Sequence, residues 1–377
     1  MLLDGLNFSR GRNDILLASD GKEYIDFVTG FGAVLLGHGN KRIVDRVRQQ
    51  LEDVWITGRL SVPVIEEAAN LAISGLAQAY RHLQFYSSGN EAVEFAIRMA
   101  TTATRRHALA GFERSMHGKS VAASALCWAN DFVELKNIYT LPFINSHSES
   151  DVLDRLERKL ASRKVAAVFV ELIQGTNGAH EASADFYRAV SDSCRRFGTL
   201  CVVDEVLTGF YRSGYLSYSQ EIGLTPDILI FGKAMGNGFP VSAVVCRSDM
   251  QVTDAMLPGS TFSNNPLGAS AVAATLTEMQ HLDMGALTRS VDTAIRSELA
   301  SLEEHGVILR GKGALWVLEF PTARSALHVQ ATALSANVVL SAYGRFVRLF
   351  PPATISSANL HKALQIINEA CLKTLSA

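Results

Sequence analysis

Short apolar runs alternate with longer amphipathic stretches along most of the chain. The runs place Val, Ile, Leu and Phe at consecutive positions, which is typical of strands buried on both faces of a parallel sheet. The alternation of strands and helices predicts an α/β fold with a mostly parallel sheet flanked by helices. Expected strands cover 83–88, 165–172, 199–206, 227–232 and 242–246, and expected helices cover 90–104, 150–162 and 184–198.

The pattern changes after about residue 270. An Ala-rich helical stretch, 267–282, is followed by strand-like runs at 314–320 and 345–350 and by a last helix at 360–375. These elements predict a smaller α+β domain, and residues 14–27 read as a hairpin that packs against it. We therefore expect three parts: an N-terminal segment 1–45 packing with the small domain, a large domain 46–268, and a C-terminal small domain 269–377.

Composition excludes several classes of function. The chain has 377 residues, 48% of them hydrophobic, with a formal net charge of −2. No basic block or basic stripe interleaved with aromatics occurs, so we expect no nucleic-acid partner. The first residues lack the layout of a signal peptide, and no apolar run approaches the ~18 residues of a membrane helix. We therefore expect no membrane partner.

The cysteines indicate a reducing compartment. They are odd in number, far apart and set in apolar surroundings, which suits reduced thiols in a cytoplasmic protein and not a disulfide framework. The histidines show no metal-ligand spacing either, so we expect no metal site. The five cysteines are Cys127, Cys194, Cys201, Cys246 and Cys371.

Polar features follow three expected strands at their carboxyl ends, where ligands sit in parallel sheets. Ser88, Gly89 and Asn90 join a strand to a helix start and can offer N–H groups to a phosphate, although an ordinary capping box explains this turn equally well. Asp204 ends an apolar run, where a buried carboxylate needs a cation or a structural ion pair. Lys233 ends the next run, inside a glycine-rich loop. The chain lacks a GxxxxGK[ST] loop, which excludes a nucleotide–magnesium site.

These three features suit pyridoxal phosphate. A lysine amine can form a Schiff base with the aldehyde of the cofactor. A carboxylate can keep the pyridine nitrogen protonated, which makes the ring an electron sink. A helix N-terminus can hold the phosphate. The spacing by itself leaves purely structural roles for the same residues equally open.

Six sequence blocks then point to a family. In chain order they read DGKEYIDF…GHGN, SSGNEAVEFAIRMA, VELIQGTNGA, VVDEVLTGFYRSG, LIFGKAMGNGFPVSAVV and GSTFSNNPLG. They resemble the class III (ω-type) aminotransferases, a subgroup of fold-type I pyridoxal-phosphate enzymes, over nearly the whole chain. The resemblance implies a large domain that binds the cofactor. It also implies ping-pong transfer of an amino group from an amine or amino-acid donor to a keto or aldehyde acceptor.

The resemblance implies a role for each matching position. Lys233 would carry the cofactor and shuttle the proton, Asp204 would pair with the pyridinium nitrogen, and Arg348 would grip a substrate carboxylate. Thr261 would reach the phosphate of the neighbouring subunit, which implies a homodimer. The implied cofactor-binding residues are Ser88, Gly89, Asn90, Met116, His117, Glu171, Asp204, Val206, Lys233 and Thr261.

The chain departs from the family pattern at several positions. Met116 replaces the aromatic ring that stacks on the pyridine, and Lys119 replaces an arginine that binds a second carboxylate in ornithine-type members. Phe31 replaces a tyrosine used on the same carboxylate. Thr176 replaces a glutamate that can mask the substrate arginine, and Leu207 replaces a common glutamine. These departures put ornithine, acetylornithine and GABA in doubt as donors, and leave Lys119 and Phe31 as candidate substrate-binding residues.

Several alternatives stay open from the sequence. An aminomutase, a racemase or a decarboxylase of the same family would carry the same lysine and aspartate. A catalytically silent binding protein would be free to lose Lys233. Arg348 would be structural if it paired with an acidic side chain such as Glu319. Tyr211 and Arg212 follow the cofactor aspartate closely enough to be further candidates for the site.

Overall fold

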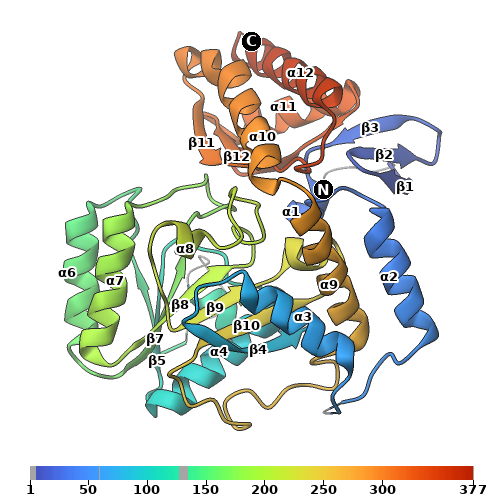
Figure 1. The fold of residues 1–377 in the computed structure, drawn as a ribbon. Coiled ribbons are helices and arrows are strands. Elements are labelled where there is room, and N and C mark those ends of the chain that lie inside the picture. Colours follow the sequence, from blue (N-terminus) through green and yellow to red (C-terminus); the bar gives the residue numbers. More distant parts are fainter. Residues whose placement is uncertain (1–5, 59, 127–134, 377) are drawn as a thin grey trace.

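A computed structural model describes residues 6–58, 60–126 and 135–376. Within this part of the chain, the largest sheet has seven strands in the order β4-β10-β9-β8-β7-β5-β6 (Figure 1). Neighbouring strands from β9 to β6 run parallel, whereas β10 runs antiparallel to both β4 and β9. The prediction of a mostly parallel sheet is therefore confirmed. The strands are β4 (Tyr80–Tyr86), β5 (Ala108–Phe112), β6 (Ile138–Leu141), β7 (Val165–Glu171), β8 (Leu200–Glu205), β9 (Ile228–Phe231) and β10 (Ser242–Arg247).

Helices cover both faces of this sheet (Figure 1). On one face, α4 (Gly89–Thr104) packs across β7, β8, β9 and β10. On the other face, the sheet shares a core with α3 (Pro63–Ser74), α6 (Glu149–Leu160) and α7 (Ala184–Phe197). All residues of β7 are buried. Burial on both faces explains why the strands read as unbroken apolar runs.

Two smaller sheets lie beside one another at the other end of the molecule (Figure 1). One has the order β11-β12-β15-β14 and is accompanied by α10, α11 and α12. The other joins the N-terminal hairpin, β2 and β3, to β13 near the C-terminus through a parallel pairing. The bounds are β1 (Phe8–Arg12), β2 (Ile15–Ala18), β3 (Glu23–Asp26), α10 (Met284–Leu299), β11 (Ile308–Lys312), β12 (Leu315–Glu319), α11 (Ala323–Ser335), β13 (Val338–Val339), β14 (Ser341–Tyr343), β15 (Phe346–Leu349) and α12 (Ser357–Leu375).

The long helix α9 (Pro266–His281) connects the two ends (Figure 1). It packs against α2 (Lys41–Glu52) and α3, which precede the large sheet, and against the short 3-10 helix η1 (Lys233–Gly236). The expected small domain begins inside this helix, although its contacts are to the large part. The division into three domains at residues 45 and 268 stays a prediction.

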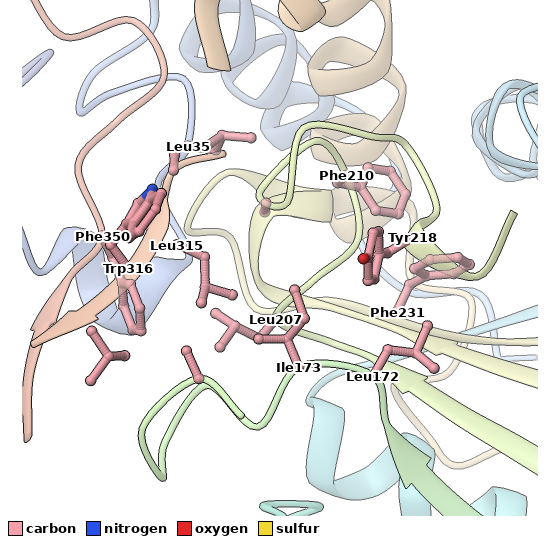
Figure 2. Packing of buried hydrophobic residues seen from close by; sticks show 14 of the residues in the cluster. Leu35, Leu172, Ile173, Leu207, Phe210, Tyr218, Phe231, Leu315, Trp316 and Phe350 are labelled. Carbon is pink, nitrogen blue, oxygen red and sulfur yellow. The ribbon is translucent and has the colours of Figure 1, made fainter. Parts of the chain in front are cut away.

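A continuous apolar core joins the large sheet to the β11-β12-β15-β14 sheet. Figure 2 shows Leu207, from the loop after β8, between Ile173 and Leu315. A Cβ on Gly175 would come within 2.1 Å of Leu207 Cδ2, so the glycine lets the two segments approach closely. Leu207, a departure from the family pattern, is therefore a core residue that links the loop after Asp204 to the small sheet.

Cys194, Cys201, Cys246 and Cys371 are buried free thiols, whereas Cys127 lies outside the described residues. Among the described helices, none combines the length and the apolar character that crossing a membrane requires.

Candidate active site

The sheet brings the predicted acidic and basic residues to one edge. Glu171 ends β7 and pairs in register with Asp204, which in turn pairs with Ile230 of β9. Lys233 follows β9 after one glycine. Because the three strands are parallel, their carboxyl ends meet, and the three side chains share one site.

Asp204 is held in place by two hydrogen bonds. Its Oδ2 lies 2.8 Å from His117 Nδ1, and its Oδ1 accepts a 2.9 Å bond from the backbone N–H of Val206. Asp204 and His117 are both buried, and His117 also meets the Phe169 ring edge to face at 5.8 Å. The sequence predicted His117 as a cofactor-binding residue; its bond to Asp204 places it beside the predicted partner of the ring nitrogen, and its contact with the cofactor stays a prediction.

Both the backbone conformation of Lys233 and the pKa of its amine differ from those of an ordinary exposed lysine. Its φ is +43°, in the left-handed region that is uncommon for non-glycine residues. The pKa of its amine is lowered to about 8, mainly by burial and to a smaller extent by the positive charges of Arg348 and Arg212. The negative charges of Glu171 and Asp204 oppose this shift. A larger share of the amine is therefore neutral near pH 7 than in an exposed lysine.

Glu171 supports the segment that carries Met116 and His117. Its Oε2 accepts a 2.7 Å hydrogen bond from the Met116 N–H. Burial raises the pKa of the Glu171 carboxyl to about 7, an effect that the charge of His117 opposes and the charge of Asp204 strengthens. The carboxyl therefore changes charge near neutral pH. Met116 is half-buried on this segment.

The first turn of α4 forms a close-fitting cradle. Ser88 caps the helix by accepting a 3.2 Å bond from the Glu91 N–H. A Cβ on Gly89 would lie 3.0 Å from Val206 Cγ1, so any larger residue would push Val206 away from the helix start. The N–H groups of a helix start, next to an apolar side chain, suit a phosphate attached to a flat ring.

Asn90 has a structural role that the sequence did not predict. Its side-chain oxygen accepts hydrogen bonds from the N–H groups of Lys119, at 2.7 Å, and Ser120, at 2.9 Å. A Cβ on Gly118 would lie 2.3 Å from the same oxygen. Asn90 therefore fixes the loop after His117 against the start of α4. The Lys119 residue itself is exposed.

Arg348 and Phe31 come together although they lie far apart in the sequence. The Arg348 guanidinium lies 5.3 Å from the centre of the Phe31 ring, and its Nη2 donates a 2.5 Å bond to Ser341 Oγ. Arg348 Nε is buried and makes no hydrogen bond to the described residues. The Glu319 carboxylate is instead paired with Arg310 and Arg345, so the alternative of an Arg348–Glu319 pair is wrong.

Arg212 is a buried structural residue that connects several segments. The sequence had suggested it as a candidate residue of the site. Its guanidinium donates to the carbonyls of Ala314, at 3.0 Å, Pro351, at 2.6 Å, and Gly32, at 3.1 Å, and to Thr29 Oγ1, at 3.3 Å. Burial lowers the pKa of Arg212 to about 9. These bonds tie the loop after β8 to the short helix α1 (Thr29–Gly32), which carries Phe31 with a φ of +58°.

Glu205 is a second structural residue that the sequence did not identify. It is buried, and its carboxylate accepts bonds from Ser217 Oγ, at 2.7 Å, and from the N–H groups of Tyr218, at 2.7 Å, and Ser219, at 2.9 Å. These bonds fold the chain after β8 into the short helix α8 (Tyr218–Glu221). The two adjacent carboxylates in VVDEV thus serve different purposes.

Thr261 lies on a separate, open surface. The residue is exposed and lines a cavity of about 700 Å³ together with Gln84 and Ser263. Its neighbour Ser260 donates a 2.7 Å bond to Glu91 Oε1 in the first turn of α4. The loop that carries Thr261 is therefore anchored to the helix that forms the cradle.

Fold and site together define an enzyme of the fold-type I pyridoxal-phosphate class. The residues fit that cofactor: a glycine that a Cβ would fill at a helix start, a buried fixed carboxylate, and a strand-end lysine with a lowered pKa. Within that class, the chain belongs to the class-III aminotransferases, whose family model matches residues 3–371. The resemblance seen in the sequence is confirmed.

Known proteins with similar sequence or fold are aminotransferases. An acetylornithine aminotransferase of Bacillus anthracis is 28% identical over 382 aligned residues, covering 98% of this chain and 96% of that protein. The structure of a transaminase from the marine bacterium Virgibacillus matches with a TM-score of 0.91 and 20% identity, covering 99% of this chain and 94% of that one. An omega transaminase from Pseudomonas jessenii in complex with PMP matches with a TM-score of 0.89 and 20% identity, covering 98% and 93% of the two chains. The structural matches show the shared fold, and the family makes this chain a pyridoxal-phosphate-dependent aminotransferase.

Proposed function

We propose that Lys233 is the catalytic lysine of this aminotransferase and that Asp204 binds the ring nitrogen of its cofactor. The observation that carries this proposal is the meeting of Lys233, Glu171 and the Asp204–His117 pair at one sheet edge. Pyridoxal phosphate supplies an electron sink for negative charge on the substrate carbon. Lys233 would hold the cofactor through its amine, and with its pKa lowered to about 8 would take up and return the proton that the amino transfer moves.

The surrounding residues would place the cofactor. Ser88, Gly89 and Asn90 at the start of α4 would hold the phosphate, since their N–H groups are not needed within the helix. Val206 would cover one face of the ring and Met116 the other. Glu171 would hold the Met116 segment and face the side of the ring that carries the hydroxyl group.

The proposal extends to a homodimer in which Thr261 reaches the phosphate in the partner subunit. The exposed loop around Thr261 and its open cavity support this arrangement. Thr261→Ala should weaken cofactor binding about tenfold or more, because a hydrogen bond to a charged group contributes about 1.5–3 kcal/mol. Equilibrium titration of cofactor, with sedimentation to establish the dimer, measures the effect.

A mixed dimer distinguishes a Thr261 that acts on the partner subunit's phosphate site from a Thr261 that acts within its own subunit. One subunit carries Lys233→Ala and the other carries Thr261→Ala. If Thr261 acts across the interface, the subunit that keeps Lys233 receives an intact threonine from its partner and binds cofactor with wild-type affinity. Weakened binding in that subunit, or a fully active monomer, would contradict the proposal.

The substrate class follows from Arg348. We propose that at least one substrate carries a carboxylate that binds this guanidinium, as glutamate or 2-oxoglutarate would. Arg348 lies close enough to Lys233 to lower its pKa, its Nε is unused among the described residues, and Glu319 is already paired elsewhere. A guanidinium fork binds a carboxylate in a bidentate manner. Phe31 lies against the guanidinium, and Lys119 would be a weaker second contact.

Arg348→Ala should weaken binding of the carboxylate substrate by about ten- to a hundredfold, which corresponds to about 1.5–3 kcal/mol. Single-turnover kinetics of each half-reaction measures this effect, with the absorbance of the bound cofactor as the signal. A neutral amine substrate should be unaffected in its own half-reaction. Arg345→Ala, which removes an exposed arginine from the turn just before β15, is the matched control and should change neither. Equal affinities for wild type and Arg348→Ala with every substrate would exclude the carboxylate clamp.

A further inference from the structure

A second pocket opens at the edge of the central sheet opposite to Lys233. It has a volume of about 340 Å³ and lies where β5, β6 and β7 begin. Val165 starts β7 and Glu171 ends it, so at about 3.3 Å per residue the pocket is about 20 Å from the active-site edge. Its lining includes Arg105, Arg106, His107, Arg163, Lys164 and Tyr139, and none of the lining residues in the described part of the chain is acidic.

One of these cations is rigidly fixed. Arg106 Nη1 donates to the carbonyls of Val165 and Phe197, each at 3.1 Å, and to Thr199 Oγ1 at 3.3 Å. Its Nη2 donates a further 3.1 Å bond to the Phe197 carbonyl. The three acceptor oxygens are two backbone carbonyls and a hydroxyl, so none of them is a carboxylate paired with the guanidinium. The protein thus holds a preorganised cation at the wall of the pocket.

The other cations of the lining have no acidic partner within residues 6–58, 60–126 and 135–376. Arg105, Arg163 and Lys164 are exposed and form no ion pair with the described part of the chain. Other arginines at the same edge of the sheet do have acidic partners. At the end of α7, Arg195 pairs with Asp192 and Arg196 pairs with Glu157. The cluster is also unexpected in a chain with a formal net charge of −2.

The backbone at both sides of the pocket is strained. Arg105 caps α4 with a φ of +54°, and Arg163 follows α6 with a φ of +53°. Helices usually place glycine or asparagine at such left-handed positions, because a larger side chain is disfavoured there. Favourable interaction with helix C-termini accounts for cations such as Arg158 in the last turn of α6. That interaction does not explain why two arginines beside one cavity, Arg105 and Arg163, have left-handed backbone conformations.

We propose that this pocket is a binding site for a small oligophosphate. Unneutralised cations around one cavity repel one another, and an anion with two or three adjacent phosphates would relieve that repulsion. Arginine forks bind phosphate oxygens in a bidentate manner, and two flexible forks beside the fixed Arg106 would chelate neighbouring phosphates. The volume is at the lower end of the range for small-molecule sites and exceeds the size of a single phosphate. This site is independent of the amino-transfer site.

The test titrates cofactor-saturated protein with inorganic pyrophosphate in a calorimeter at constant ionic strength. Saturation with cofactor fills the phosphate cradle at α4, so the signal reports the second pocket. We expect one site per subunit in the wild type, and at least tenfold weaker binding in the double variant Arg105→Gln/Arg163→Gln. The control variant Arg158→Gln removes an exposed arginine from the same edge, outside the pocket lining, and should bind like wild type.

The remaining outcomes separate the alternatives. Amino-transfer activity and the circular dichroism spectrum should be unchanged in both variants, which shows that they fold. Titration with ATP distinguishes a free oligophosphate from a nucleotide: equal affinity for both assigns recognition to the phosphates, and tighter ATP binding adds a contact to the base. Failure of the wild type to bind pyrophosphate, equal weakening by the control variant, or binding of an acidic peptide in preference to pyrophosphate would overturn the proposal.

Discussion

Lys233→Ala should abolish amino transfer, with a loss of about 10⁴-fold or more in the rate of each half-reaction. General acid–base catalysis alone contributes up to about 10⁴-fold, and the same amine would also hold the cofactor. The lowered pKa of Lys233, about 8, keeps the amine able to take up and release a proton near neutral pH. Stopped-flow absorbance of the bound cofactor, with donor alone, measures this rate directly.

Two further measurements distinguish loss of the catalytic amine from unfolding of the variant. The variant should still bind cofactor reversibly, because the α4 cradle and Asp204 are intact, but borohydride should no longer attach the cofactor to the chain. A small primary amine added to the solution should restore part of the activity. Lys312→Ala is the matched control: Lys312 is also partly buried and bonded, to Glu181 at 3.2 Å, but lies outside the site. It should keep near wild-type rates. A Lys233→Ala enzyme with unchanged turnover would refute the assignment.

The elements that the sequence predicted well are those with a clear local pattern of apolar and polar residues. The strand expected at 165–172 is observed at Val165–Glu171, and the helix expected at 184–198 is observed at Ala184–Phe197. Both are determined by local patterns: an unbroken apolar run in the strand, and an amphipathic repeat ended by Gly198 in the helix. The position of the site at the strand ends then follows from the parallel arrangement.

The missed elements have two different causes. Strand β5 consists of Ala, Leu, Ala, Gly and Phe, and its small residues carry little strand signal. Tertiary packing requires a small residue in this strand, because a Cβ on Gly111 would lie 2.3 Å from the Leu126 carbonyl oxygen. Helix α2, in contrast, could have been predicted. Asn40 precedes an amphipathic repeat and caps the N–H groups of Arg42 and Ile43.

The hydrogen-bond partners of the site residues could not be predicted from the sequence. Asp204 and Glu205 are adjacent, yet one bonds His117 and the other bonds the segment from Ser217 to Ser219. The partner of Asp204 is 87 positions away, and no local pattern reveals it. Family resemblance could assign a role to Asp204, but it could not show that Arg212 makes two hydrogen bonds to α1 and two more to the carbonyls of Ala314 and Pro351.

Asp204→Asn should reduce both half-reactions by about 10²–10⁴-fold, which corresponds to the roughly 3–5 kcal/mol lost when one partner of a buried ion pair is removed. The carboxylate is buried and oriented by Val206 and His117, so its negative charge is available to a protonated ring nitrogen in a site with little water. Asparagine has nearly the same shape and can still accept the Val206 N–H, but it carries no charge. The cofactor should therefore bind in the same place with a neutral ring nitrogen, and the electron sink should weaken.

A cofactor analogue with a methyl group on the ring nitrogen gives the decisive comparison, because its ring charge is permanent. In wild type the analogue should support slower transfer than the natural cofactor. In Asp204→Asn it should be faster than the natural cofactor, since the variant no longer needs to keep a proton on the nitrogen. Glu205→Gln is the matched control, as it removes the neighbouring buried carboxylate, whose bonds to described residues go to the Ser217–Ser219 segment and Thr208. It should lower the melting temperature and leave the preference between the two cofactors unchanged. If Asp204→Asn and Glu205→Gln behaved alike with both cofactors, Asp204 would be a structural residue and not the partner of the ring nitrogen.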